Sequence, residues 1–317
     1  MVALDELLGN VEIVDELSIK DFRIVFINTQ TRPTDVIPLD IATRQNLVKV
    51  TEVSEEGVVN LLRIENLSDK HVICFRGDVL KGGKQNRVLG TTIILPPTEQ
   101  ISIKPHKLSG SIHPIPTTRR HVLALCLCVE PGRWSDWDED FDYVSKGLYV
   151  SRFETLRSEV MTRSRAKLST MRMLQGRTWS AIANHLRAFH IHSRTGDLVE
   201  LLEGIEGDIE VPKNANGVII YYKNELVWGE IYNIPNPQKH LNDTVKSILI
   251  DIYAKAQRGR KRKPTRTLLR ELMEAHLERV DSIGCEEAYI IRCDDVMGFL
   301  VCLNGKPVYL EFMENTE

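Results

Sequence analysis

The segment Arg76–Arg87 (RGDVLKGGKQNR) combines glycines, cations and side-chain amides within a short stretch. Glycines let a backbone approach a ligand closely, and Lys and Arg side chains neutralise anions. Lys84 and Arg87 are therefore candidate phosphate-binding cations. Gln85 and Asn86 would orient the same ligand through hydrogen bonds. The segment is not a Walker A loop, which carries Ser or Thr where this chain has Gln85. An exposed basic turn is an equal alternative.

The segment Cys128–Trp134 (CVEPGRW) carries a second set of reactive groups at a Pro-Gly turn. Arg133 offers a bidentate group that would clamp an oxyanion, and Trp134 offers a surface on which a base stacks. Glu130, together with Asp78 from the first segment, forms a candidate general acid/base pair. The alternative is structural, with Trp134 capping the core and Glu130 pairing with Arg133.

Clusters of cysteine, histidine and aspartate are candidate metal ligands. Cys126 and Cys128 lie on one face of a strand, but neither a CxxC spacing nor a second pair is present. We therefore expect no metal here, and we interpret these residues as buried thiols and surface histidines, the latter being His185, His190 and His192. The tract Asp136–Asp142 lacks the glycine and glutamate of an EF-hand loop, which favours a solvated acidic loop. No pattern identifies a cofactor.

The charges nearly cancel, but they are clustered. The 317 residues hold 41 Lys+Arg and 44 Asp+Glu, for a formal net charge of -3. Residues 152–194 are basic, and Lys255–Arg266 (KAQRGRKRKPTR) is the densest basic tract. Such a tract can bind the phosphate backbone of a nucleic acid without sequence preference. The alternative is a solvated loop between helices, so nucleic acid remains a second candidate partner.

The sequence does not indicate a membrane protein. Its longest apolar run, Val122–Val129, is far shorter than the roughly 20 residues that span a bilayer. The first residues are acidic and lack a positively charged region, so we expect no signal peptide. The six scattered cysteines then indicate reduced thiols and a cytoplasmic location.

The secondary structure that must position these groups is predicted to change from strands to helices along the chain. The first 130 residues contain many short segments rich in Val, Ile and Thr, which predict strands of a β-sandwich or partly open barrel. A short helix is predicted over Pro38–Asn46, with Asp40 as its N-cap. From about residue 145 the spacing becomes helical, with apolar stripes over 151–189, 241–253 and 268–280.

Two sixteen-residue segments in the second half resemble each other. Gly217–Tyr232 and Gly298–Met313 share glycine, valine and glutamate at matching positions, and each has a polar turn between two apolar stretches. Asn304-Gly305 is a strong signal for a type I′ hairpin turn. The sequence therefore predicts two related hairpins, with chance similarity as the alternative.

The order of these motifs resembles one known family. The family is named for its association with ADP-ribosylglycohydrolase, rhodanese and phosphatase-superfamily proteins. It is the first of the domains named in this way. GGKQNR followed by CVEPGRW is the specific part of the resemblance. The remaining matches are Pro38–Glu52, Arg63–Asn66, Thr91–Leu95, Gln175 with Trp179, Ser193–Gly196 and the two hairpins. The chain departs from the family where Val79 replaces the second of two adjacent acids, and 106–121 looks like an insertion.

The resemblance implies a cytoplasmic protein linked to the metabolism of NAD and ADP-ribose derivatives. It also makes Gln175 a candidate ligand-binding residue. We therefore expect an α+β protein with a β-rich unit over 1–145, packed against an α+β unit over 146–317 that contains the two hairpins. The leading hypothesis is binding of a phosphorylated nucleotide or ADP-ribose-type ligand, and the sequence leaves open whether the ligand is also turned over. A nucleic-acid-associated module and a non-enzymatic scaffold are the alternatives.

Overall fold

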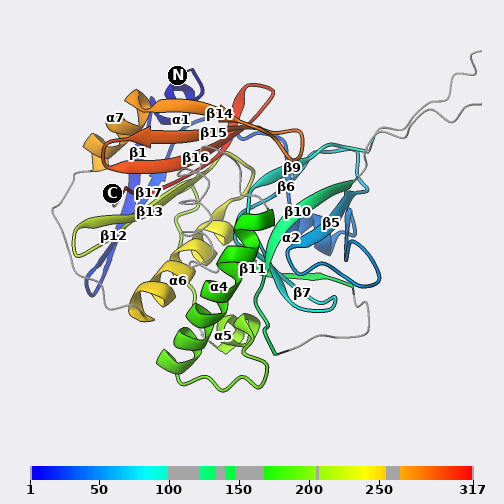
Figure 1. Ribbon diagram of the computed structural model, residues 1–317. Coiled ribbons are helices and arrows are strands. Elements are labelled where there is room, and N and C mark those ends of the chain that lie inside the picture. The colour runs from blue at the N-terminus through cyan, green and yellow to red at the C-terminus, as the bar shows by residue number, and fades with distance from the viewer. Residues whose placement is uncertain are drawn as a thin grey trace, which may run out of the picture.

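The computed structural model describes residues 2–98, 121–132, 140–146, 168–204, 207–254 and 265–315. The protein is α+β, as the sequence predicts. Figure 1 shows a β-rich unit on one side and a large sheet, with helices against it, on the other. Helices α4 and α6 run between them.

The large sheet has eight antiparallel strands in the order β1-β2-β12-β13-β17-β16-β15-β14. Its strands are Glu12–Ile19 (β1), Phe22–Asn28 (β2), Gly217–Tyr222 (β12), Glu225–Tyr232 (β13), His276–Val280 (β14), Glu287–Cys293 (β15), Val296–Leu303 (β16) and Lys306–Glu314 (β17). The central strands read as continuous apolar runs because both of their faces are buried. Strands from both ends of the chain meet in this sheet, and the division into units at residue 145 stays a prediction.

The two predicted hairpins, β12–β13 and β16–β17, lie side by side at the centre of the large sheet. Each turns through two residues with positive φ, Lys223–Asn224 in one and Asn304–Gly305 in the other. Strand β13 pairs with β17 so that Glu230 lies opposite Glu311. These two glutamates are also equivalent in the sequence comparison of the hairpins. An approximate twofold axis through this pair therefore relates the two hairpins.

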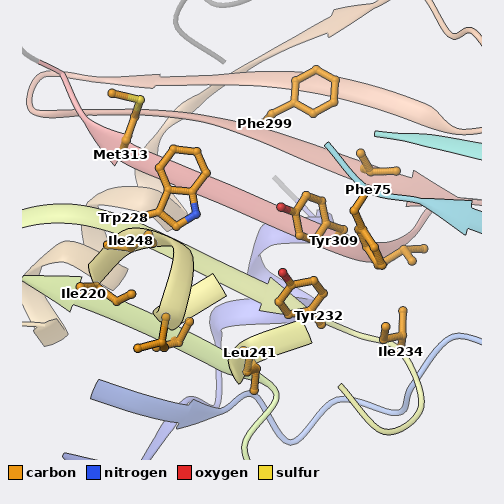
Figure 2. Close-up of a cluster of buried hydrophobic side chains, with 14 of the residues drawn as sticks. Phe75, Ile220, Trp228, Tyr232, Ile234, Leu241, Ile248, Phe299, Tyr309 and Met313 are labelled. Carbon is orange, nitrogen blue, oxygen red and sulfur yellow. The ribbon is translucent and has the colours of Figure 1, made fainter. Parts of the chain in front are cut away.

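Different layers cover the two faces of the large sheet. One face packs against α1 (Val2–Leu8) and α7 (Thr265–Glu274), which also contact each other. The other face packs against α6 (Gln238–Ala254) and against Phe75 and its neighbours from the β-rich unit. Figure 2 shows this second core, in which Tyr232 and Tyr309 lie among aromatic and aliphatic side chains, Phe75 among them. The β-rich unit is thus joined to the large sheet by a shared core.

The β-rich unit contains a six-stranded sheet that curls into a half-barrel, which agrees with the predicted partly open barrel. Its order is β11-β7-β8-β10-β5-β4, with bounds Val48–Thr51 (β4), Leu61–Asn66 (β5), Asp78–Lys81 (β7), Arg87–Leu89 (β8), His121–Cys128 (β10) and Asp142–Lys146 (β11). A small sheet adds Ile37–Pro38 (β3), Val72–Cys74 (β6) and Ile93–Leu95 (β9). The core of this unit includes the apolar face of α2 (Leu39–Arg44).

Two further helices pack on the half-barrel. Helix α4 (Leu168–Ala188) buries Ile182 and Leu186 with Leu127 of β10, and α5 (Leu198–Gly204) joins the same core. The backbone N–H of Leu198 donates to the carbonyl of Val129 at 3.0 Å. This bond places the start of α5 beside the end of β10.

Two local predictions were wrong. Pro38, not Asp40, is the N-cap of α2, and Asp40 lies in the first turn, where its carboxylate accepts a hydrogen bond from Arg44 at 2.9 Å. The apolar stripe over 268–280 is not one helix, because α7 ends at Glu274 and His276–Val280 forms strand β14. Pairing with β15 satisfies the backbone of that segment, so tertiary context overrides the helical spacing. The stripe over 241–253 does form a helix, α6.

Candidate ligand site at the 82–87 loop

The glycines of the 82–87 loop, which joins β7 to β8, make room for the protein's own chain. A Cβ on Gly82, whose φ is +131°, would lie 2.4 Å from the carbonyl oxygen of Asp140. A Cβ on Gly83, whose φ is +54°, would lie 2.2 Å from the ring of Phe141. The Gly82 N–H donates to Oδ1 of Asn86 at 2.9 Å. These glycines therefore serve the packing of 140–141, rather than the close ligand approach expected from the sequence.

The backbone of Lys84 and the side chain of Arg87 both contact Glu52, which follows β4. The backbone N–H of Lys84 donates to Oε1 of Glu52 at 3.1 Å, and Nη2 of Arg87 makes a longer contact of 3.5 Å with the same oxygen. Arg87 also donates from Nη1 to the carbonyl of Gln85 at 2.6 Å. Its side chain is fully buried, as is that of Glu52 to within 1%. Arg87 thus organises the loop from inside.

Asn86 joins the loop to two carboxylates. Its Nδ2 donates to Oδ2 of Asp197 at 3.0 Å, and its backbone N–H makes a long contact of 3.4 Å with Oε2 of Glu130. Gln85 reaches the same place, because its Nε2 donates to the backbone carbonyl of Glu130 at 3.3 Å. We call the residues joined in this way the motif cluster: Glu52, Lys84, Gln85, Asn86, Arg87, Glu130 and Asp197.

Asp197 is the N-cap of α5. Its Oδ1 accepts the N–H of Val199 at 3.0 Å, and its own N–H donates to the hydroxyl of Ser193 at 2.8 Å. Burial raises the pKa of Asp197 to about 6, with Glu130 adding to the rise and the donors from Val199 and Asn86 opposing it. A carboxyl group that titrates near neutral pH beside a second carboxylate is a candidate acid/base group.

Gln175 does not reach the motif cluster through the contacts that the structure gives; it clamps α4 to β10. Its Nε2 donates to the carbonyl of Cys128 at 2.7 Å, and its Oε1 accepts the N–H of Cys128 at 2.9 Å. The same Oε1 accepts Nδ2 of Asn60 at 2.9 Å, and Trp179 donates to the carbonyl of Cys128 at 3.1 Å. Its role as a ligand-binding residue stays a prediction.

The remaining predicted site residues are Asp78, Arg133 and Trp134. Asp78 accepts the backbone N–H of Phe75 at 2.7 Å and so closes the turn before β7. Its role as a general acid or base stays a prediction. Arg133 and Trp134 lie outside the described residues. Three of the predicted site residues, Lys84, Arg87 and Glu130, lie in one network of hydrogen bonds that passes through Glu52 and Gln85.

The motif cluster lies directly beneath exposed turns. Pro131 and Gly132, which follow Glu130, are exposed, and so are residues 54–56, which follow Glu52 closely. A Cβ on Gly57 would lie 3.0 Å from Cδ of Lys84. The N–H of Gly132 donates to the carbonyl of Thr195 at 2.7 Å, which holds the turn after β10 against the turn before Asp197. The cluster is thus buried but close to solvent.

Sequence reasoning missed Glu52 and Asp197 as members of the site. Glu52 ends the Pro38–Glu52 segment, and Asp197 directly follows the Ser193–Gly196 segment, so both border stretches that carry the family resemblance. No local spacing links either residue to the 82–87 loop. Only the fold brings these distant segments together.

The residues weighed as metal ligands have other roles. Within the described ranges, no group of three or more His, Cys, Asp or Glu side chains is arranged to hold a metal ion. Burial raises the pKa of Cys126 to about 12. The expectation of surface histidines was wrong for His185, which is buried between α4 and α6 with its Nε2 2.8 Å from Oδ1 of Asp251. His190 and His192 are exposed. Residues 136–139 of the acidic tract and 255–264 of the basic tract lie outside the described part.

The fold and the motif cluster define an α+β protein with an acid- and amide-rich candidate site at the ends of half-barrel strands. The chain belongs to the ARPP-1 family, the ARG and Rhodanese-Phosphatase-superfamily-associated Protein domain, whose sequence model matches residues 10–105 and 116–313. Both halves of the chain therefore belong to the family. Comparison with curated proteins and with solved structures gave no match. Among the helices that the structure describes, none has the length and apolar character needed to cross a bilayer.

Proposed function

We propose that the motif cluster binds a phosphorylated nucleotide or ADP-ribose-type ligand. The observation that carries this proposal is the run of hydrogen bonds that joins Lys84 and Asn86 to Glu52, Glu130 and Asp197 beneath exposed turns. A cluster that contains ionisable groups of both signs, side-chain amides and a perturbed carboxyl group is typical of a ligand or active site. The family's association with ADP-ribose-related superfamilies favours this class of ligand.

Buried atoms within the cluster support the same proposal. In the described part of the chain, Oε2 of Glu52 and Nε of Arg87 are buried without a hydrogen-bond partner. A buried polar atom that lacks a partner costs about 1–3 kcal/mol, so such atoms are normally satisfied by water or a ligand. A ligand hydroxyl would satisfy Glu52, and a ligand oxygen would satisfy Arg87.

In this proposal each residue has a role that follows from its charge and its hydrogen-bonding groups. Lys84 neutralises phosphate, with Arg133 as a second anion clamp and Trp134 as a stacking surface. Gln85 and Asn86 orient the ligand. Glu130 and Asp197 form the acid/base pair for turnover, because Asn86 contacts both of them. Arg87 supports the loop from inside, and, within the described residues, only its Nε is left to meet a ligand oxygen.

Calorimetric titration with ADP-ribose, NAD, ADP and inorganic phosphate tests the proposal. We expect Lys84→Met to weaken ADP-ribose binding about 10- to 100-fold, because a charge-assisted hydrogen bond contributes about 1.5–3 kcal/mol. Lys81→Met is the matched control, since Lys81 is exposed on β7 and pairs with Glu203. Absence of binding by a folded protein would refute the ligand class. Equal losses in the two variants would refute the assignment to the loop.

A further inference from the structure

The carboxyl groups of Asp197 and Glu130 both contact Asn86. Asp197 is only 5% exposed and Glu130 only 4% exposed. Asn86 contacts Asp197 through its side chain and Glu130 through its backbone. The second acid that acts on Asp197 is Glu200, in the first turn of α5. Asp197 therefore faces one carboxylate from the turn after β10 and one from its own helix. Its hydrogen-bond donors are the neutral amides of Val199 and Asn86.

An anionic ligand would add a third negative charge to this arrangement. Two or more negative charges in an enclosed place cannot all remain ionised cheaply, so one group takes up a proton. A protonated carboxyl group also gains an O–H that can donate to an anionic oxygen. Ligand binding and protonation of Asp197 would then favour each other.

We propose that Asp197 takes up a proton from solvent when a phosphorylated ligand binds at the 82–87 loop, and that it then donates a hydrogen bond to an anionic oxygen of that ligand. This inference rests on the proposed function and adds to it a proton-linked recognition of the phosphate. No covalent bond changes, since one carboxylate and one proton give one carboxyl group. The raised pKa of free Asp197, about 6, agrees with this role, because the free group is mostly ionised at pH 7 and so has a proton to gain.

Calorimetry with ADP-ribose as the probe measures the linkage, because its diphosphate does not itself titrate near neutral pH. Titrations at pH 7 in buffers of different ionisation enthalpy give the number of protons taken up. We expect close to one proton per ligand (about 0.9), and an affinity that falls about tenfold between pH 7 and pH 8. In Asp197→Asn the uptake should vanish and the affinity should become independent of pH over this range.

Controls separate the possible outcomes. Glu200→Gln removes the neighbouring charge on α5 and should keep the proton uptake. Circular dichroism checks the fold of Asp197→Asn, and Asp197→Ser, which also suits an N-cap, serves as the second variant if the first unfolds. Binding by the wild type without proton uptake, or uptake that persists in both Asp197 variants, would overturn the inference and leave the proposed function standing. No binding at any pH would refute both.

Discussion

Two buried polar clusters lie in this protein, and they differ in what surrounds them. The motif cluster lies beneath exposed turns at 54–56 and 131–132. The second, which we call the glutamate–tyrosine cluster, lies between the large sheet and the β-rich unit and consists of Arg76, Glu230, Tyr232, Thr244, Tyr309 and Glu311. All six of these residues are fully buried. One segment, 76–87, supplies a cation to each cluster.

The contacts of the glutamate–tyrosine cluster are internal. Arg76 donates from Nε to Glu311 at 2.7 Å, and Tyr309 lies 2.8 Å from Glu230 and 3.0 Å from Glu311. Thr244 of α6 donates to Glu230 at 2.5 Å, and Tyr232 bonds the same carboxylate. Figure 2 shows the hydroxyl groups of the two tyrosines near each other. We infer that this cluster fixes the packing of the units, whereas the motif cluster is the one for which ligand binding is proposed.

The largest effect is expected from Arg76→Met. Removing one partner of a buried ion pair leaves the other charge uncompensated, so we expect the free energy of unfolding to fall by about 4 kcal/mol. Urea unfolding measures it. Glu203→Ala, which breaks the exposed pair with Lys81, is the control and should change stability by less than about 1 kcal/mol. A loss below about 1 kcal/mol in Arg76→Met would contradict the structural role.

Gly83→Ala tests whether the loop glycines serve packing. The added methyl group meets the ring of Phe141, and the residue has φ of +54°, so we expect a loss of about 2–3 kcal/mol in stability. Phe141→Ala in the same chain should remove part of that loss. A double-mutant cycle would then show a coupling of about 1–2 kcal/mol. Strictly additive effects would show that packing against Phe141 does not explain the glycine.

Asp197 should make stability depend on pH in a defined direction. Its pKa is raised from 3.8 to about 6 in the folded protein, so the folded state holds the proton more tightly than the unfolded chain does. The resulting stabilisation is complete below pH 3.8 and is lost as the pH rises through 6. Between pH 4 and pH 7.5 the wild type should lose about 2 kcal/mol relative to Asp197→Asn. Parallel unfolding curves at the two pH values check this, and the opposite sign would exclude a raised pKa.

The smallest effect is expected from Thr244→Val in the glutamate–tyrosine cluster. This change keeps the shape of the side chain and removes one hydroxyl group bonded to Glu230, which should lower stability by about 1 kcal/mol. Affinity for ADP-ribose should stay unchanged, in contrast to Lys84→Met. Unfolding and calorimetry on the same samples test both statements. If Thr244→Val lost as much affinity as Lys84→Met, the assignment of ligand binding to the motif cluster alone would be refuted.

Sequence reasoning predicted only some residues of the candidate site. It identified the loop residues and Glu130 because glycine-rich cationic segments and a Pro-Gly turn are local signals. It attributed the glycines to ligand approach, whereas Gly82 and Gly83 make room for Asp140 and Phe141. It also could not detect Asp197, because the hydrogen bond to Asn86 joins residues more than a hundred positions apart.

The sequence by itself determined the family, the α+β class and the two hairpins, because these depend on local motifs and on short-range periodicity. The tertiary structure alone decided that β1 and β2 join the same sheet as the hairpins and that Glu230 pairs with Glu311. It also decided which carboxyl groups share the motif cluster. Strand order and the burial of charges depend on contacts between distant segments, and neither composition nor spacing encodes which segments meet.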